Sequence, residues 1–392
     1  GINYFLSIFE CYNYNNKGEP IMKLPAFGVE EWLNQHEKEA IYDIAGSTIA
    51  SLTLEELFEV TGEDSQAFYQ NLHQKPLNYG WIEGSPDFKK GVANLYQNLE
   101  PENILQTNGA TGANFAVLYA LIEAGDHVIA HYPSYQQLYD IPESLGATVD
   151  YWQVKEDLNW LPDLDVLEQL IRPNTKLITI NNANNPTGAY MNRDYLDTLI
   201  AIAKAHDLYI VSDEVYHSFA SDHLLGIADL YDKGISVNSM SKTFSLPGIR
   251  VGWLAASEEI VELLRTYRDY TMICAGVFDD MVAALALKHA PKLLQRNRQI
   301  LTRNLNLLDN WVQQEEKVSY VKPKQVSTAF VKLAIEEAIE PFALRLLRDY
   351  GTLVVPGNRF DRDKHVRIGY CCQPEILQAG LSALSEMLKN IQ

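Results

Sequence analysis

Short runs of β-branched and apolar residues alternate with amphipathic helical patterns through the middle of the chain. Two of these runs, KLITIN at 176–181 and LYIVS at 208–212, lack the alternation of polar and apolar residues that a half-exposed strand shows. Such runs fit strands that are covered on both faces, and strands separated by helices indicate βαβ units. The sequence therefore predicts an α/β fold with a mostly parallel sheet covered by helices, with its other strands at 128–132, 148–154, 235–239 and 249–255 and its helices at 135–145, 164–171 and 193–206.

The pattern changes after residue 257, where helices and strands no longer alternate one by one. Helices are expected at 258–267, 279–316 with a break at Pro291, 341–350 and 374–391, and strands at 318–321, 329–333, 353–355 and 365–370. This order predicts a smaller C-terminal α+β domain. We expect an N-terminal arm and large domain over 22–285 and a small domain over 286–392, with segment 22–50 packing against the small domain; residues 1–21 are expected to be an extension outside the fold.

The chain is strongly acidic. Its 392 residues include 51 Asp and Glu against 32 Lys and Arg, a formal net charge of −19. Nucleic-acid phosphates and anionic lipids repel such a protein, and no apolar run reaches the roughly 20 residues of a membrane-spanning helix. The four cysteines form no CxxC pair, which favours reduced thiols. We expect a cytoplasmic protein with neither nucleic-acid nor membrane partners.

A stretch of small residues, Asn108-Gly109-Ala110-Thr111-Gly112-Ala113, precedes an apolar helical pattern at 115–124. Small side chains leave backbone N–H groups open, and a helix N-terminus adds partial positive charge, so the stretch can bind an anion. It matches neither the P-loop nor GxGxxG. A simple helix cap is the alternative.

Two further segments carry groups that suit a cofactor. Asp213 ends a buried strand, at the sheet edge where ligands bind; it either caps the following turn or holds a protonated heteroaromatic nitrogen. Lys242 stands among the hydroxyls of Ser239, Ser241 and Thr243, with Arg250 behind it. A lysine in such a pocket can act as an amine nucleophile, and an arginine fork suits a phosphate; a polar surface loop is the alternative.

These segments taken together match the needs of pyridoxal phosphate, which has an aldehyde for the lysine, a ring nitrogen for the aspartate and a phosphate for the loop, serine and arginine. No metal site is expected, because His127 and His131 lie on one predicted strand and the other histidines are scattered. Asp279 and Asp280 are either selectors of a basic substrate or acidic residues at a helix N-terminus.

The sequence resembles the class I/II aminotransferases, which are fold type I pyridoxal-phosphate enzymes. Asn185-Pro186-Thr187-Gly188 resembles the NPTG element of that family, and Asp213, Lys242 with Arg250, and Arg367 follow in the family's order. The resemblance extends from about residue 23 to the C-terminus. It implies a homodimer that transfers an amino group between an α-amino acid and a 2-oxo acid.

The resemblance also implies a role for individual residues. Lys242 would be the Schiff-base lysine, Asp213 the partner of the ring nitrogen, and Tyr216 with Asn185 the ligands of the phenolic oxygen. The remaining cofactor contacts would be Ala110, Thr111, Ser239, Ser241 and Arg250 at the phosphate, Tyr135 on the ring face, and Tyr79 at the phosphate of the neighbouring subunit. Arg367, Asn185 and Gly46 would bind the substrate.

The chain departs from the family at one loop. Residues 42–48 lack the usual acidic-Pro stretch, and together with Leu246-Pro247-Gly248 they look closest to a branch with capreomycidine-synthase-like enzymes, which use the cofactor for elimination and cyclisation. Elimination or cyclisation is therefore the alternative reaction. No second arginine for a dicarboxylate is evident. A non-catalytic regulatory protein is a third hypothesis, disfavoured because the lysine is present and no helix-turn-helix is appended.

Overall fold

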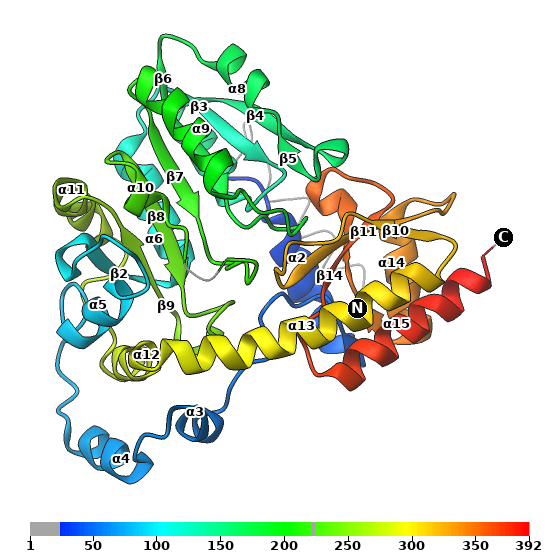
Figure 1. Ribbon diagram of the computed structural model, residues 1–392, viewed down its shortest axis with the longest axis horizontal. Coiled ribbons are helices and arrows are strands. Elements are labelled where there is room, and N and C mark those ends of the chain that lie inside the picture. The colour runs from blue at the N-terminus through cyan, green and yellow to red at the C-terminus, as the bar shows by residue number, and fades with distance from the viewer. Residues whose placement is uncertain (1–23, 222–223, 392) are drawn as a thin grey trace, which may run out of the picture.

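A computed structural model describes residues 24–221 and 224–391, so the extension expected at 1–21 lies outside the described residues. Within those residues the larger sheet has eight strands in the order β2-β9-β8-β7-β6-β3-β4-β5 (Figure 1). β3, β4, β6, β7 and β8 run parallel, whereas β9 is antiparallel to β2 and β8, and β5 to β4. The mostly parallel sheet predicted from the sequence is confirmed. Its strands are β2 (Ile104–Asn108), β3 (His127–Tyr132), β4 (Thr148–Lys155), β5 (Leu161–Pro162), β6 (Thr175–Asn181), β7 (Tyr209–Asp213), β8 (Gly234–Ser239) and β9 (Val251–Ala255).

Helices cover both faces of this sheet, which explains the continuous apolar runs. Leu177 of β6 packs in one core with α6 (Gly109–Leu121) and α11 (Glu258–Arg268). Its neighbour Ile178 packs in the opposite core with α8 (Leu164–Leu170), α9 (Arg193–Ala205) and α10 (Ile227–Leu230). Since successive strand residues point to opposite faces, both sides of the strand must be apolar. Two further helices, α5 (Pro86–Ala93) and α12 (Val277–Lys288), cover the β2–β9 end, and α7 (Gln137–Ser144) follows β3.

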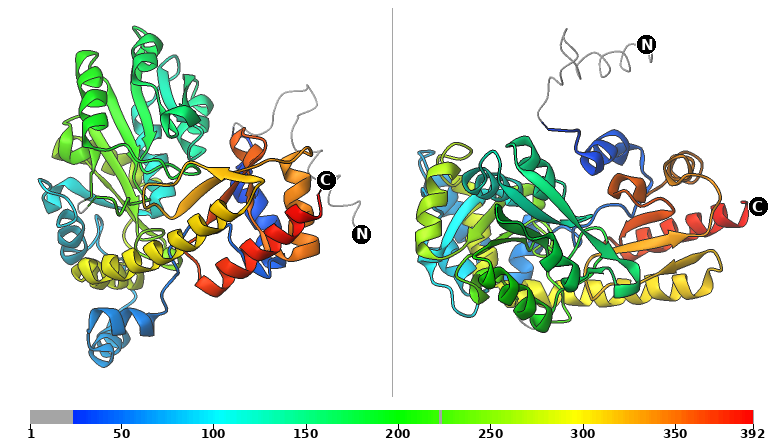
Figure 2. Two further views of the ribbon diagram at one scale, coloured as in Figure 1. Left: turned by 45° about the vertical axis from the view of Figure 1, so that its right-hand side comes forward. Right: turned by 90° about the horizontal axis from the view of Figure 1, so that it is seen from above.

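The C-terminal part is built on a four-stranded antiparallel sheet in the order β10-β11-β14-β13. Its strands are β10 (Val318–Tyr320), β11 (Thr328–Leu333), β13 (Val355–Pro356) and β14 (His365–Gly369), and its helices are α13 (Ala290–Gln314), α14 (Ile339–Tyr350) and α15 (Pro374–Lys389). Helix α13 extends from beside α12 to α15 and so joins the two parts (Figures 1 and 2).

The N-terminal segment packs on this C-terminal part. Helix α2 (Gly28–His36) buries Val29 and Trp32 in the core of the smaller sheet. Strand β1 (Tyr42–Asp43) pairs in parallel with β12 (Thr352–Leu353). Two helices, α3 (Leu54–Thr61) and α4 (Ser65–Gln74), then lead toward α5; α4 has no buried residue and projects from the body of the molecule in Figure 1. The short 3-10 turns are η1 (Glu37–Glu39), η2 (Pro101–Asn103), η3 (Glu156–Leu158), η4 (Pro247–Ile249) and η5 (Gly357–Phe360).

Three predicted elements differ from the structure. The helical segment expected at 279–316 is divided, as predicted, but the break is at His289 and not at Pro291, which lies in the first turn of α13, where its missing N–H costs no hydrogen bond. The strand expected at 353–355 is divided, because β12 pairs with β1 and β13 with β14. Helix α6 begins at Gly109, earlier than the apolar stretch that signalled it.

Candidate active site

A cavity of about 620 Å³ opens at the carboxyl ends of three neighbouring parallel strands. Asn181, Asp213 and Ser239 are the last residues of β6, β7 and β8, and all three line it. This edge is where open α/β sheets bind ligands. Helix α2 and residues Arg359, Phe360 and Arg367 of the C-terminal part close the opposite side.

The structure brings nearly all of the predicted site residues together. Those that line the cavity are Gly46, Ala110, Thr111, Tyr135, Asn185, Asp213, Tyr216, Ser239, Ser241, Lys242, Arg250 and Arg367. The exception is Tyr79, whose side chain is 86% exposed on the molecular surface.

Asp213 is a buried carboxylate held in a defined orientation. Its Oδ2 accepts a hydrogen bond from Asn114 Nδ2 at 2.8 Å, and its Oδ1 accepts one from the Val215 N–H at 3.3 Å. Burial raises the pKa of Asp213 from 3.8 to about 6, against the effect of these hydrogen bonds and of the Lys242 charge. A cationic group that binds beside the carboxylate offsets the free-energy cost of burying its negative charge.

Lys242 follows β8 and reaches the cavity from a loop that hydroxyl groups fix. Ser239 Oγ accepts from the Ser241 N–H at 3.1 Å, and Thr48 Oγ1 donates to the Ser241 carbonyl at 3.1 Å. Thr243 does not reach the cavity, because its hydroxyl donates to the Val215 carbonyl in the core. No described residue forms a hydrogen bond or ion pair with Lys242 Nζ, so this amine is available to a ligand.

The start of α6 and Arg250 form a cradle for an anion. Gly109 has φ +65°, which disfavours a side chain, and a Cβ there would lie 2.8 Å from Arg250 Nη2. The guanidinium therefore lies against the helix N-terminus, beside Ala110 and Thr111. Backbone N–H groups, hydroxyls and an arginine fork suit the phosphate of pyridoxal phosphate, and Lys242 and Asp213 suit its aldehyde and ring nitrogen, so the residues present fit this cofactor.

Arg367 is a buried cation that no described carboxylate pairs with. Its Nη1 donates to Asn185 Oδ1 at 3.0 Å, its Nη2 donates to the Ala45 carbonyl at 2.8 Å, and its Nε has no partner among the described residues. Burial lowers the pKa of Arg367, opposed by Tyr216, Glu30 and Asp43. A buried cation without a counter-ion is unfavourable, so an anionic ligand group fits this end of the cavity.

Sequence reasoning missed some residues of the site. Asn114, which orients Asp213, lies one helical turn after Ala110 on α6; that spacing is the signal that could have found it. Ser47 Oγ lies 2.7 Å from the Tyr216 hydroxyl, and the buried Ser134 hydroxyl lines the cavity without a described partner.

Some residues singled out in the sequence lie elsewhere. Asp280 is buried, and its Oδ1 accepts from the Ser85 N–H and from Gln106 Nε2, both at 2.9 Å. It holds the end of the 79–85 loop and does not line the cavity, and neither does Asp279. His127 contacts Thr175 and Asp150, and His131 Nδ1 accepts from the Asn181 N–H. Across residues 24–221 and 224–391, no group of histidine, cysteine or acidic residues could hold a metal ion, and no helix is long and apolar enough to cross a membrane.

Comparison with known proteins identifies the family. The profile of "Aminotransferase class I and II" matches residues 51–384. A PLP-dependent aminotransferase from Streptococcus suis has a similar crystal structure, with a TM-score of 0.93 and 61% identity over 95% of this chain and 99% of that one. The structure of a PLP-dependent cyclase, OrfR, has a TM-score of 0.84 and 27% identity over 93% of this chain and 97% of that one. Capreomycidine synthase from Streptomyces vinaceus is 27% identical over 93% of this chain and 94% of its own length.

The match covers most of the chain, and similar structures span both of its parts. The predicted family is confirmed, and with it the fold type I architecture and the cofactor. The chain belongs to the class I and II aminotransferases, a family of pyridoxal-phosphate-dependent enzymes.

Proposed function

We propose that this protein transfers an amino group between an α-amino acid and a 2-oxo acid. The observation that carries the proposal is that Lys242, Asp213 and Arg367, which lie far apart in the sequence, line one cavity at the carboxyl edge of the sheet. The similarity to a PLP-dependent aminotransferase from Streptococcus suis supports it.

The cofactor would be held at each of its functional groups. Lys242 would bind the aldehyde carbon, Asp213 the ring nitrogen, and Tyr135 the ring face. The phenolic oxygen would contact Asn185 and Tyr216, and the phosphate would contact Ala110, Thr111, Ser239, Ser241 and Arg250, all of which line the cavity.

When bound, pyridoxal phosphate supplies an electron sink for the pair released as the substrate Cα–H bond breaks. Asp213, ionised beside the ring nitrogen, keeps a proton on that nitrogen. The Lys242 amine removes the proton from Cα and returns it as general acid. Arg367, fixed by Asn185 and Ala45, binds the substrate α-carboxylate and so sets the direction of the Cα–H bond.

A homodimer is the second part of the proposal. Large exposed apolar side chains are concentrated in two stretches of the chain, which together we call the apolar face: Leu77, Tyr79, Trp81 and Ile82 in one, and Tyr270, Ile273 and Phe278 in the other. The two stretches that form it lie side by side, because the Ala275 N–H donates to the Trp81 carbonyl at 2.8 Å. Patches of this kind mark protein interfaces. We infer that a second copy covers the apolar face and that Tyr79 contacts the partner's cofactor phosphate.

Elimination or cyclisation on the same site is the alternative function. The similarity to capreomycidine synthase and to the cyclase OrfR favours it. Both reactions begin with loss of the Cα proton to Lys242, so the cavity residues named above serve either one.

The two functions differ in whether repeated turnover requires an added 2-oxo acid as amino-group acceptor. The purified, cofactor-loaded protein is incubated with a panel of amino acids while its absorption spectrum is followed and the products are identified. An aminotransferase releases a 2-oxo acid once per site and turns over only when a second 2-oxo acid is added. Ammonia with an unsaturated product, or a cyclic product, formed repeatedly without an acceptor would contradict the proposal and support the alternative.

A further inference from the structure

The charged side chains around the cavity differ in whether a partner already neutralises them. They are Glu30, Glu37, Asp213, Lys242, Arg250, Arg359 and Arg367. The proposed function uses Lys242, Asp213 and Arg250 for the cofactor and Arg367 for the substrate α-carboxylate. Glu30, Glu37 and Arg359 remain, and they lie on the side formed by α2 and the C-terminal part.

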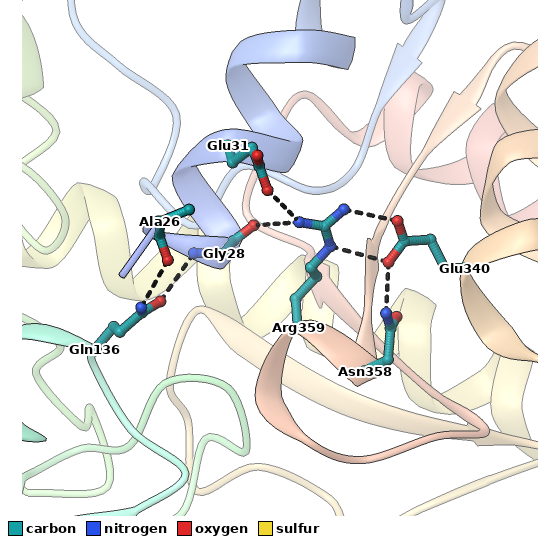
Figure 3. Close-up of polar contacts among 7 residues, drawn as sticks. All are labelled: Ala26, Gly28, Glu31, Gln136, Glu340, Asn358 and Arg359. Carbon is teal, nitrogen blue, oxygen red and sulfur yellow. Dashed lines mark hydrogen bonds and ion pairs between the residues drawn. The ribbon is translucent and has the colours of Figure 1, made fainter. Parts of the chain in front are cut away.

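Arg359 is saturated by its own neighbours (Figure 3). Its Nη2 and Nε donate to the two oxygens of Glu340 at 2.6 and 2.9 Å. Its Nη1 donates to Glu31 Oε2 at 2.8 Å and to the Gly28 carbonyl at 3.3 Å. A fork paired with two carboxylates is not free to bind a third. Arg359 therefore does not provide a site for a substrate side-chain carboxylate.

The same contacts fix α2 over the cavity. Gln136, which precedes α7 in the larger part, accepts from the Gly28 N–H at 2.8 Å and donates to the Ala26 carbonyl at 2.9 Å (Figure 3). On the other side, Trp32 Nε1 donates to the Val354 carbonyl at 2.9 Å. The first turn of α2 is thus held from both parts of the molecule. Glu31 points to Arg359, while the adjacent Glu30 lines the cavity.

Glu30 is an exposed carboxylate at the cavity rim that has no neutralising partner among the described residues. No hydrogen bond or ion pair joins its carboxylate to any other residue in the described ranges, and the same is true of Glu37. Its charge acts on two residues that line the cavity: burial raises the pKa of Tyr135 with Glu30 adding to the effect, and Glu30 opposes the lowering of the Arg367 pKa by burial.

Two buried groups mark this space independently as a ligand site. Arg367 Nε and Ser134 Oγ are both buried without a partner among the described residues, and both residues line the cavity. A ligand bound there has a cation for its carboxylate at Arg367 and an unpaired carboxylate at Glu30, and Phe27, Val29 and Leu33 add apolar lining to the same cavity.

We propose that Glu30 makes the enzyme select amino acids whose side chain ends in a cation, with Glu37 adding to the negative field. This inference rests on the proposed function, which places the α-carboxylate at Arg367. A cationic side chain gains an ion pair with Glu30, whereas the second carboxylate of a dicarboxylic amino acid meets like charge and, among the described residues of this chain, no free cation beside Glu30. Glu30 is a specificity residue and takes no part in proton transfer.

Binding without turnover tests the inference. Three carboxylates of similar length that lack the α-amino group, and so cannot react, are titrated calorimetrically into the cofactor-loaded protein: 5-guanidinopentanoate, hexanoate and adipate. We expect the guanidino acid to bind most tightly and adipate most weakly. Glu30→Gln should weaken binding of the guanidino acid by about two- to fivefold, leave binding of hexanoate unchanged and strengthen binding of adipate. Glu30→Lys should reverse the order of the three affinities.

Glu39→Gln is the matched control, because it removes an equal charge from the same segment at a residue that does not line the cavity; it should leave all three affinities unchanged. The cofactor absorbance of each variant reports that the site is intact. Tighter binding of adipate than of the guanidino acid, no measurable binding of the guanidino acid, or the same order in Glu30→Gln and Glu30→Lys would overturn the inference. Since no reaction is involved, these outcomes are independent of whether the protein proves to be an aminotransferase.

Discussion

Asn114 Nδ2 lies 2.8 Å from Asp213 Oδ2 and donates the one side-chain hydrogen bond that the structure gives this carboxylate. The two residues come from different layers of the fold: Asn114 lies in the second turn of helix α6, and Asp213 ends strand β7 of the sheet. The amide offsets part of the free-energy cost of burying the carboxylate, and together with the Val215 N–H it fixes the orientation of the carboxylate. It therefore couples the proposed phosphate cradle to the proposed partner of the ring nitrogen.

Replacement of Asn114 by Ala should destabilise the cofactor-free protein by about 1–3 kcal/mol at pH 7, because Asp213 would lose a donor in a buried setting. The free energy of unfolding in urea measures this directly. Asn108→Ala is the control, since Asn108 stands just before the same helix and its side chain makes no cap hydrogen bond. Equal stabilities of the two variants would show that the Asn114–Asp213 contact contributes nothing.

The stability of the cofactor-free protein should depend on pH through Asp213. Burial raises its pKa in the folded state from 3.8 to about 6, so the folded protein binds this proton more tightly than the unfolded chain. The stabilisation is complete below about pH 4 and is lost as the pH rises to about 6; it amounts to about 3 kcal/mol. Burial also raises the pKa of Glu214, to about 8, so the contribution of Asp213 is measured as the difference in the free energy of unfolding between the wild type and Asp213→Asn. This difference should fall by about the same amount between pH 4 and pH 7. A flat difference would be evidence against the shifted pKa.

With cofactor bound, Asp213→Asn should keep the fold and lose most of its activity. An amide cannot keep a proton on the ring nitrogen, so the electron sink weakens, and we expect kcat to fall about a thousandfold, or ~4 kcal/mol in the barrier. Circular dichroism and cofactor absorbance control for folding and loading. Near-normal turnover would mean that this carboxylate only caps the turn after β7.

Lys242 should carry the cofactor covalently. Its amine has no described partner and lies in the cavity with Asp213. Borohydride reduction of the loaded protein followed by peptide mapping should place the pyridoxyl group on Lys242, and Lys242→Ala should give no labelled peptide. A label on any other lysine would refute the assignment.

The residues that could be predicted from sequence are those whose signal is local. Asp213 and Ser239 end apolar strands, and Lys242 stands among hydroxyls, so the neighbouring residues in the sequence indicate that these positions belong to a site. No local sequence pattern indicates Glu30, Ser47 or Asn114, because the role of each depends on residues far away in the sequence. Gln136 and Arg359 hold the helix that carries Glu30, and Ser47 contacts Tyr216. The division of β12 from β13 is hidden for the same reason, since adjacent residues pair with strands from opposite ends of the chain.

A charge placed on the apolar face should separate the proposed subunits. Tyr270 is 89% exposed in the single chain, so Tyr270→Glu should leave the stability of the isolated chain unchanged while it shifts sedimentation from dimer to monomer. Leu158→Glu, at an exposed position in the turn η3 between β4 and β5, is the control and should remain dimeric. A wild-type protein that sediments as a monomer would contradict the dimer itself.

Tyr79 should act in the active site of the partner subunit. It is exposed in its own chain and lies outside that chain's cavity, in a loop held against 274–277. If each site combines Lys242 of one chain with Tyr79 of the other, a mixed dimer of Tyr79→Phe and Lys242→Ala chains has one site with both substitutions and one site with neither. Equal mixing of the two variants after unfolding and refolding should therefore restore about a quarter of wild-type activity, since half of the dimers are mixed and each has one intact site. Each variant refolded alone is the control. If Tyr79 served its own chain, every site would retain one lesion, and the mixture would show only the average of the two variants.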